Sequence, residues 1–291
     1  MNLVLPLRKI VHRTRGYGHG PIVRLMSPSD LGEELKPFVF LDLFEADMRN
    51  LAGSMPVHPH CGIATVTVFT NGDVTFDDPH LGHGTIGYGG VEWVRAGRGM
   101  WHGKELSAGS SAAVQGFQLW IALPPDLENA EPEVQYVGTG GMPIIGPARL
   151  IVGAYAGARS PVRSPHGVNY LLTLKPGERW TYEPPLGHLI SWVAVGKGAL
   201  TAGERLVKGD LALFEKSEAP MTFEGTEGAG ATFVLGSAVP HPYALHLGSY
   251  SVHTSAAALA AGERHIRKLK QSLDATGDRR TGSGSTPVFR T

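Results

Sequence analysis

The sequence has little of three features that would place it in a specialised class: cysteine, net charge and long apolar runs. Its single cysteine, Cys61, rules out an intramolecular disulfide framework and is typical of a reducing compartment. Lysine and arginine together number 26, as do aspartate and glutamate, so no global positive charge predicts binding to nucleic acid or anionic lipid. No apolar run approaches the roughly 20 residues of a membrane-spanning helix, and the first residues lack a signal-peptide pattern. We therefore expect a cytoplasmic protein, with neither direct nucleic-acid binding nor membrane insertion.

The chain has enough apolar residues for buried cores, at 42% hydrophobic, and they favour strands. Short β-branched and aromatic runs recur between glycine-containing turns: IATVTVFT at 63–70, VEWVRA at 91–96, QGFQLWIAL at 115–123 and LISWVAV at 189–195. Runs of this length predict an all-β sandwich or barrel. Helical periodicity is clear only at 255–273, where three leucines and an isoleucine recur on one face. The sequence predicts an all-β fold with a short C-terminal helix.

The segment GTGGMPIIGP interrupts the strand pattern near the middle of the chain. Each half contains a strand that ends in a glycine turn, at Gly72 and at Gly196. Each half also has a later glycine that precedes an apolar run, at Gly90 and at Gly209. Similar units in two halves indicate an internal repeat. We expect two β-barrels in tandem, the second with the helix, and then a flexible tail, with ranges 1–137, 138–273 and 274–291.

Two histidines, His58 and His60, stand where a predicted strand begins. In a strand, residues i and i+2 point to the same face, so both imidazoles can meet one metal ion. A second segment, AGRGMWHGKEL, supplies His102 and Glu105, and a β-barrel brings such distant strands together. Three neutral imidazoles and one carboxylate suit a divalent first-row metal with positions open for water or substrate. The alternative is that the histidines are ordinary surface residues.

The segments HPHCGIATVTVFTNG, GYGGVEWVRAGRGMWHGKEL and GFQLWIALP together resemble the pirin family of bicupins. Upstream, GPIVRLMSPSDLGEELKPFVFLDLFEAD is similar to the opening of that family, while the second half resembles it mainly in architecture. The resemblance implies two tandem cupin barrels of the jelly-roll type. It also implies a metal site, usually iron, made by three histidines and one glutamate in the N-terminal barrel. His58, His60 and His102 match those ligand positions directly. We expect one divalent ion, Fe(II) first, with zinc, manganese, nickel, copper and cobalt as alternatives.

The fourth ligand position departs from the family pattern. The family has His-x-Glu after AGRG, whereas this sequence has HGKE at 102–105. The extra residue would turn the carboxylate to the other face of a regular strand, but a bulge at Gly103 could bring Glu105 back. We expect Glu105 to be a ligand; otherwise it stays outside and water takes its place. Ala64 also stands where the family's first motif has glutamate, and Cys61 where it often has arginine, which implies a pocket of altered charge.

The second half lacks good metal ligands at the equivalent positions. Counted from Gly196 and Gly209, the places of the three histidines are taken by other residues: Tyr182, Pro184 and Met221. We therefore expect a metal-free C-terminal barrel. Aromatic residues of the first half could line a substrate pocket, but aromatics on barrel strands are more often core residues. These residues are Trp93, Trp101, Phe117 and Trp120. Cys61, one residue beyond His60, is expected to face away from the metal as a small buried hydrophobe.

The resemblance implies two alternative functions. Several pirin-like proteins show quercetin 2,3-dioxygenase activity, which implies a mononuclear metal dioxygenase for a flavonol or related small aromatic substrate. Glu105 would then serve as the catalytic proton acceptor. Pirins are also implicated as partners of transcription factors or metabolic enzymes, which implies instead a non-catalytic interaction protein that responds to the redox state of its metal. We favour the dioxygenase and expect a monomer.

Overall fold

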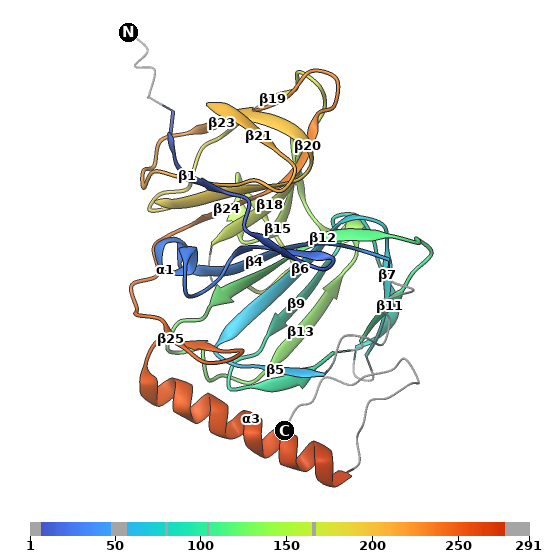
Figure 1. Cartoon of the computed structure of the whole chain (residues 1–291), viewed down its shortest axis with the longest axis vertical. Coiled ribbons are helices and arrows are strands. Elements are labelled where there is room, and N and C mark those ends of the chain that lie inside the picture. Colours follow the sequence, from blue (N-terminus) through green and yellow to red (C-terminus); the bar gives the residue numbers. More distant parts are fainter. Residues whose placement is uncertain (1–6, 48–56, 79–80, 104, 165–166, 277–291) are drawn as a thin grey trace.

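The computed structural model describes residues 7–47, 57–78, 81–103, 105–164 and 167–276. Most regular structure in these ranges is β-strand, as predicted, and Figure 1 shows two stacked groups of strands with a long helix across one end. The α-helices are α1 (Leu31–Leu35) and α3 (Ala256–Thr276), and η1 (Thr139–Gly141) is a 3-10 helix. No helix within these ranges has the length and apolar character needed to cross a membrane.

The N-terminal half is built on a seven-stranded antiparallel sheet. Its strands, in spatial order, are β13 (Glu133–Val137), β9 (Val91–Arg95), β6 (Ile63–Asn71), β12 (Val114–Ala122), β4 (Phe38–Ala46), β3 (Ile22–Met26) and β2 (Tyr17–His19). Two smaller sheets complete this half: β10 (Met100–His102) with β5 (His58–His60), and β11 (Leu106–Ala108) with β7 (Val74–Asp78) and β8 (Gly82–Ile86). Long strands with β-branched side chains form the large sheet because such residues pack well on a pleated surface.

The C-terminal half contains a ten-stranded sheet. Its main path is β1 (Ile10–Thr14), β22 (Leu211–Phe214), β20 (Ile190–Ala202), β24 (Ala231–Ala238), β18 (Val168–Leu174), β15 (Ala148–Val152) and β14 (Ile144–Ile145). Three strands branch from it: β19 (Arg179–Tyr182), β21 (Glu204–Val207) and β23 (Met221–Gly225). Two short hairpins add β16 (Ala154–Tyr155) with β17 (Ala158–Arg159), and β25 (His246–Leu247) with β26 (Val252–His253). These jelly-roll sheets confirm the expected tandem cupin architecture.

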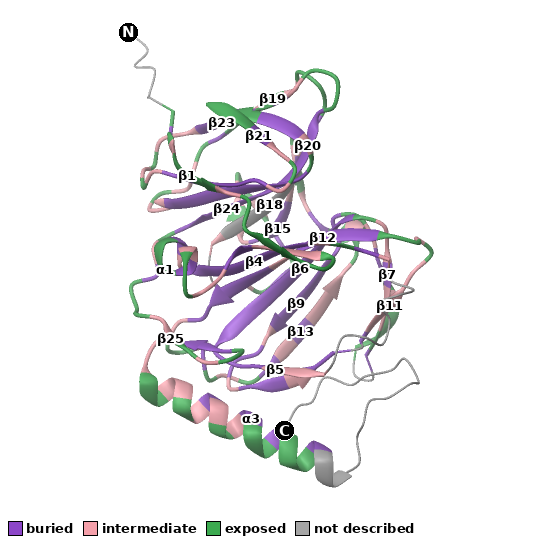
Figure 2. Cartoon of the chain, viewed as in Figure 1, coloured by how far each residue is buried: buried purple, intermediate pink, exposed green. Residues whose placement is uncertain are grey.

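The largest hydrophobic core joins the two halves. It includes Trp93 and Phe117 from the first half and Trp192 and Leu213 from the second, all at most 2% exposed. Phe38 packs edge-on against Trp192, with ring centroids 5.5 Å apart. Figure 2 shows the buried strands concentrated where the two large sheets face each other. Trp93 and Phe117 are therefore core residues, as expected for aromatics on barrel strands.

The terminal elements cross between the two halves. Strand β1 pairs with β22 of the C-terminal half, although it comes from the start of the chain. Helix α3, from the end of the chain, lies against β10 and the β25–β26 hairpin near the N-terminal half (Figure 1). The helix predicted at 255–273 is confirmed and runs on to Thr276, while 277–291 lie outside the described residues. The boundary predicted near residue 138 stays a prediction.

Candidate metal centre

The structure brings together the three histidines that the sequence singled out. Strands β5 and β10 pair in antiparallel register, with His58 opposite His102 and His60 opposite Met100. One nitrogen from each of the three rings lies within 4.8 Å of the other two. His58 and His60 point to the same face of β5, as expected of His-x-His in a strand, and the neighbouring strand β10 adds His102.

The opposite face of this strand pair is covered by helix α3. Pro59 lies opposite Trp101 in the register, between the two histidine positions. The indole Nε1–H of Trp101 donates to the main-chain carbonyl of Ile266, at 3.0 Å, in α3. The Trp101 side chain therefore packs against helix α3. This does not support the idea that Trp101 lines a substrate pocket. Trp120 instead lies edge-on to His60, with ring centroids 4.9 Å apart, and it also stacks on Phe40 at 4.1 Å.

His60 has the environment of a prepared metal ligand. The residue is 1% exposed, and its Nδ1–H donates to the main-chain carbonyl of Tyr250 at 3.2 Å. The other ring nitrogen, Nε2, is buried without a hydrogen-bond partner among the described residues. Burial, and then the nearby His58, lower the pKa of His60 to about 3, so the ring stays neutral. A neutral imidazole with Nδ1 bonded to a carbonyl presents the Nε2 lone pair, the usual arrangement of a metal-bound histidine.

Glu105 is also buried, at 3% exposed, but it follows a turn. Its Oε2 accepts a hydrogen bond of 2.7 Å from the main-chain N–H of Gly103. Gly103 has a φ of +135°, which side chains other than hydrogen rarely allow, so glycine permits the bend expected after His102. Within the described residues, the group of mutually close ligand atoms contains the three histidines and does not include Glu105. Its role as fourth ligand stays a prediction, and Lys104 lies outside the described residues.

A row of polar residues crosses the large sheet on the face that carries Trp120. Cross-strand register aligns them over β9, β6, β12, β4 and β3: Glu92, Thr67, Gln118, Asp42 and Arg24. The Thr67 hydroxyl donates to Glu92 at 3.1 Å, and Arg24 pairs with Asp42 at 2.7 Å. Burial raises the pKa of Glu92 to about 7 and also raises the pKa of Asp42. The row lies two residues, about 7 Å, along the strands from Trp120, on the sheet face from which Trp120 contacts His60.

Cys61 is fully buried, as expected, but it has polar partners that the sequence did not predict. Its sulfur shares a hydrogen bond of 3.2 Å with Nε2 of His253, and Nδ1 of His253 lies 3.2 Å from Glu128. Glu128 also accepts hydrogen bonds from the main chain and hydroxyl of Thr254, at 2.6 and 2.8 Å. Burial raises the pKa of Cys61 to about 12, so the thiol stays neutral. No sequence spacing joins Cys61 to His253, which is 192 residues away.

The other departure from the family pattern, Ala64, faces the core between the two large sheets. It is fully buried in the same cluster as Trp93 and Trp192. Cys61 in turn faces His253. Neither side chain points into the group of three histidines, so the inference that these two positions alter the charge of the pocket is not supported.

The internal repeat inferred from the sequence has a structural counterpart. In the C-terminal half, Tyr182 of β19 lies opposite Met221 of β23, as His58 lies opposite His102. Tyr182 and Met221 are both at most 1% exposed and belong to the second hydrophobic core. The equivalent strand pair therefore carries packing residues where the first half carries imidazoles. The absence of a second metal stays a prediction.

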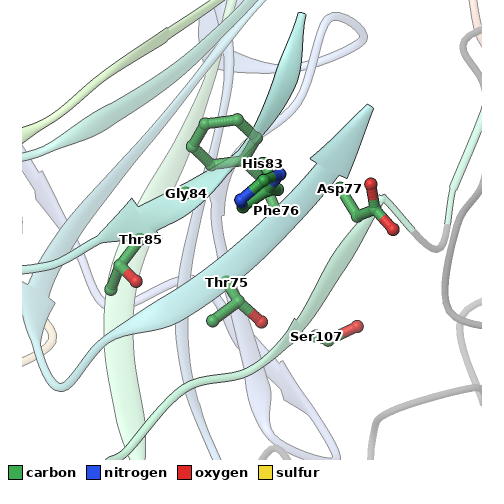
Figure 3. A pocket seen from close by; sticks show the side chains of 7 residues that line it. All are labelled: Thr75, Phe76, Asp77, His83, Gly84, Thr85 and Ser107. Carbon is green, nitrogen blue, oxygen red and sulfur yellow. The ribbon is translucent and has the colours of Figure 1, made fainter. Parts of the chain in front are cut away.

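A separate surface pocket of about 360 Å³ lies on the three-stranded sheet of β7, β8 and β11. Figure 3 shows the side chains that line it: Thr75, Phe76, Asp77, His83, Gly84, Thr85 and Ser107. His83 is exposed, and its register partner on β7 is Asp77. This pocket is formed by another sheet than the β5–β10 pair that carries the histidines.

Comparison with known proteins relates the whole arrangement to one family. The family model described as Pirin matches residues 22–121. A pirin-like protein of Solanum lycopersicum is 32% identical over 237 residues, which cover 75% of this chain and 79% of that protein. Protein PA2418 of Pseudomonas aeruginosa, provisionally named a quercetin 2,3-dioxygenase, is 28% identical over 240 residues, 76% of this chain and 82% of that protein. The crystal structure of a quercetin 2,3-dioxygenase from Acinetobacter baumannii shares the fold, with a TM-score of 0.78, 23% identity, and coverage of 91% of this chain and 98% of that one.

Proposed function

This chain belongs to the pirin family of cupin metal-binding proteins, and we propose that it is a metal-dependent dioxygenase for a flavonol or related planar aromatic substrate. The observation that carries the proposal is the group of three histidines, two of them buried, with Nε2 of His60 left for a ligand. The name of the Pseudomonas relative supports the substrate class, because that protein aligns over most of both chains.

His58, His60 and His102 would hold the metal, with Fe(II) as the first candidate. Three imidazoles suit any of several divalent first-row ions, so zinc, manganese, nickel, copper and cobalt are alternatives. A bound divalent ion supplies a Lewis acid that polarises a substrate oxygen and favours its deprotonation. His58 is partly exposed, whereas His60 and His102 are buried. A substrate would therefore approach the metal from the side of His58.

Glu105 is the proposed proton acceptor, whether or not it also reaches the metal. The hydrogen bond from Gly103 fixes one carboxylate oxygen next to His102, and burial excludes bulk water from it. An ionised carboxylate accepts hydrogen bonds only, as removal of a proton from a phenolic or enolic hydroxyl requires. His60 does not compete for that proton, because its Nδ1–H is bonded to the Tyr250 carbonyl and its Nε2 would bind the metal.

Oxygen consumption tests this function directly. Metal-free protein is reloaded anaerobically with each candidate ion, then mixed with oxygenated buffer and a panel of flavonols that includes quercetin. We expect oxygen uptake that requires both the metal and the flavonol and that is lost in His102→Ala. Uptake that persists in His102→Ala, or in protein without metal, would show that the three-histidine group is not the active centre.

The alternative is a non-catalytic interaction protein whose surface responds to its metal. One observation favours it: His58 and Tyr250 are partly exposed, so the metal centre reaches the protein surface. Stoichiometric metal binding together with no oxygen uptake across the flavonol panel would support this role. The partner would then be sought as a protein retained by the metal-loaded chain and released by the metal-free chain.

A further inference from the structure

A hairpin from the far end of the chain lies directly on the metal centre. Between β25 and β26, Tyr250 places its main-chain carbonyl on Nδ1 of His60, at 3.2 Å. The Tyr250 ring lies near both neighbouring histidines, with centroids 6.0 Å from His58 and 6.1 Å from His60. The residue is 46% exposed, so one side of the ring faces solvent. Tyr250 therefore contacts two of the three candidate ligands while it forms part of the surface.

The hairpin is fixed to the two residues that follow His60. Cys61 forms a parallel bridge with Ser251, and the main-chain N–H of Val252 donates to the Cys61 carbonyl at 3.4 Å. Gly62 has a φ of +75°, and a Cβ there would lie 2.0 Å from the carbonyl oxygen of Val252. This close approach requires glycine at position 62. The contacts fix the hairpin relative to the strand that carries His60.

Buried polar groups and helix α3 fix the same hairpin from its other side. His253 of β26 lies between the Cys61 thiol and Glu128, with 3.2 Å on each side. The hydroxyl of Ser251 donates to Glu263 of α3 at 3.4 Å. A Cβ on Gly262 of α3 would lie 2.7 Å from Nε2 of His253, so the helix packs closely on this residue. A segment fixed at so many points holds Tyr250 in one position.

We propose that Tyr250 is a specificity-determining residue of the metal centre and that it has two separate roles, one for its ring and one for its main-chain carbonyl. The ring forms one wall of the entrance beside His58 and His60, and stacks on a planar aromatic ligand. The main-chain carbonyl positions His60 by holding its Nδ1–H, which leaves Nε2 for the metal. The aromatic nature of the ligand rests on the proposed function, whereas the positions of the entrance and of His60 do not.

A substitution at Tyr250 separates the two roles, because it removes the ring and keeps the carbonyl. The probes are Co²⁺, measured by its visible absorption, and quercetin, titrated into the cobalt-loaded full chain. In Tyr250→Ala we expect Co²⁺ affinity within about twofold of the wild type, and quercetin binding weaker by about two- to tenfold, as for loss of one aromatic contact. Tyr250→Phe should bind both probes like the wild type. The matched control is Tyr243→Ala, a tyrosine of similar exposure whose ring contacts His241.

Unchanged quercetin affinity in Tyr250→Ala, or an equal loss in Tyr243→Ala, would overturn the role of the ring in stacking. If quercetin binds to no form of the protein, the proposed substrate class fails instead. The entrance is then tested by removal of Co²⁺ with EDTA, which is not aromatic. Because the ring would form one wall of the proposed entrance, we expect removal to be several times faster in Tyr250→Ala than in the wild type and Tyr243→Ala. Equal rates in all three would overturn the entrance.

The positioning role has its own measurement, which needs neither metal nor substrate. Two-dimensional ¹H–¹⁵N spectra of the histidine rings distinguish the two neutral tautomers in the metal-free protein, and the signals of His60 are those lost in His60→Gln. We expect the Nδ1–H tautomer of His60 in both the wild type and Tyr250→Ala, because the carbonyl is present in both. The Nε2–H tautomer in the wild type would overturn the positioning by Tyr250.

Discussion

Replacement of Glu92 by glutamine should stabilise the protein at neutral and alkaline pH. Glu92 lies on β9 at 6% exposure, and burial raises the pKa of its carboxyl from 4.5 to about 7. The Thr67 hydroxyl donates a hydrogen bond to Oε2 of Glu92. The amide oxygen of glutamine can accept the same hydrogen bond and carries no charge. Glu92→Gln therefore changes the charge of a buried group and little of its shape.

The magnitude and sign follow from the pKa of Glu92 in the two states. As pH rises from about 4.5 to about 7, the unfolded chain loses this proton while the folded chain keeps it. The folded state of the wild type is therefore favoured by this group at low pH, and the advantage is lost as pH rises through that window. A difference of about 2.5 pKa units corresponds to about 3 kcal/mol, or about 5 °C in unfolding temperature for a chain of this size.

The assay is urea unfolding at pH 4, 6 and 8 in the presence of EDTA, so that metal binding does not contribute. The free energies of unfolding of Glu92→Gln and wild type should agree near pH 4 and diverge in favour of the variant up to pH 8. Glu224→Gln, on the exposed face of β23, is the matched control and should show a difference within about 0.5 kcal/mol at every pH. An effect of Glu92→Gln that is independent of pH, or a destabilisation at pH 8, would show that burial of the Glu92 charge does not cost the folded state stability.

Three further predictions concern the metal centre and its surroundings. His58→Ala and His60→Ala should each lose stoichiometric metal, measured by elemental analysis of protein purified without a histidine tag; full retention would contradict histidine ligation. Glu105→Gln should weaken metal binding by roughly tenfold and abolish flavonol turnover, and a variant that keeps both would make Glu105 a bystander. Cys61, with a pKa raised to about 12, should resist iodoacetamide in the folded protein at pH 8 and react fully in urea, as followed by mass spectrometry.

The three histidines could be predicted from the sequence because the information that places them is local. Alternation in a strand puts His58 and His60 on one face, and the antiparallel partner strand needs only the correct register to add His102. Counting from the glycine turns gave Tyr182 and Met221 as the equivalents of His58 and His102 in the second half, and these two residues do lie opposite each other. Patterns of period two, once anchored by glycine turns, determine which residues can meet.

The covering of the metal centre could not be predicted in this way. Strands β25 and β26 have two residues each, too short to show a periodicity, and the hairpin reaches His60 only through long-range packing. The same holds for the contact of Cys61 with His253, and for helix α3, whose amphipathic pattern shows that it buries one face but not against which part of the fold. Tyr250 therefore carries no signal in the sequence that would mark it as a neighbour of His60.

The departures from the family pattern differ in how directly they affect the metal centre, because their side chains lie in different places. Ala64, on β6, packs between the two large sheets, and Cys61, directly after β5, packs on His253, so neither substitution lies on the face that the three histidines share. They belong to the packing around the centre and leave the three imidazoles in place. The longer His-to-Glu spacing is different, because it falls on the metal side and sets where the Glu105 carboxylate lies. If this centre has lost or changed an activity found in its relatives, the cause is to be sought at the Gly103 turn rather than at the two positions where the sequence differs most in charge.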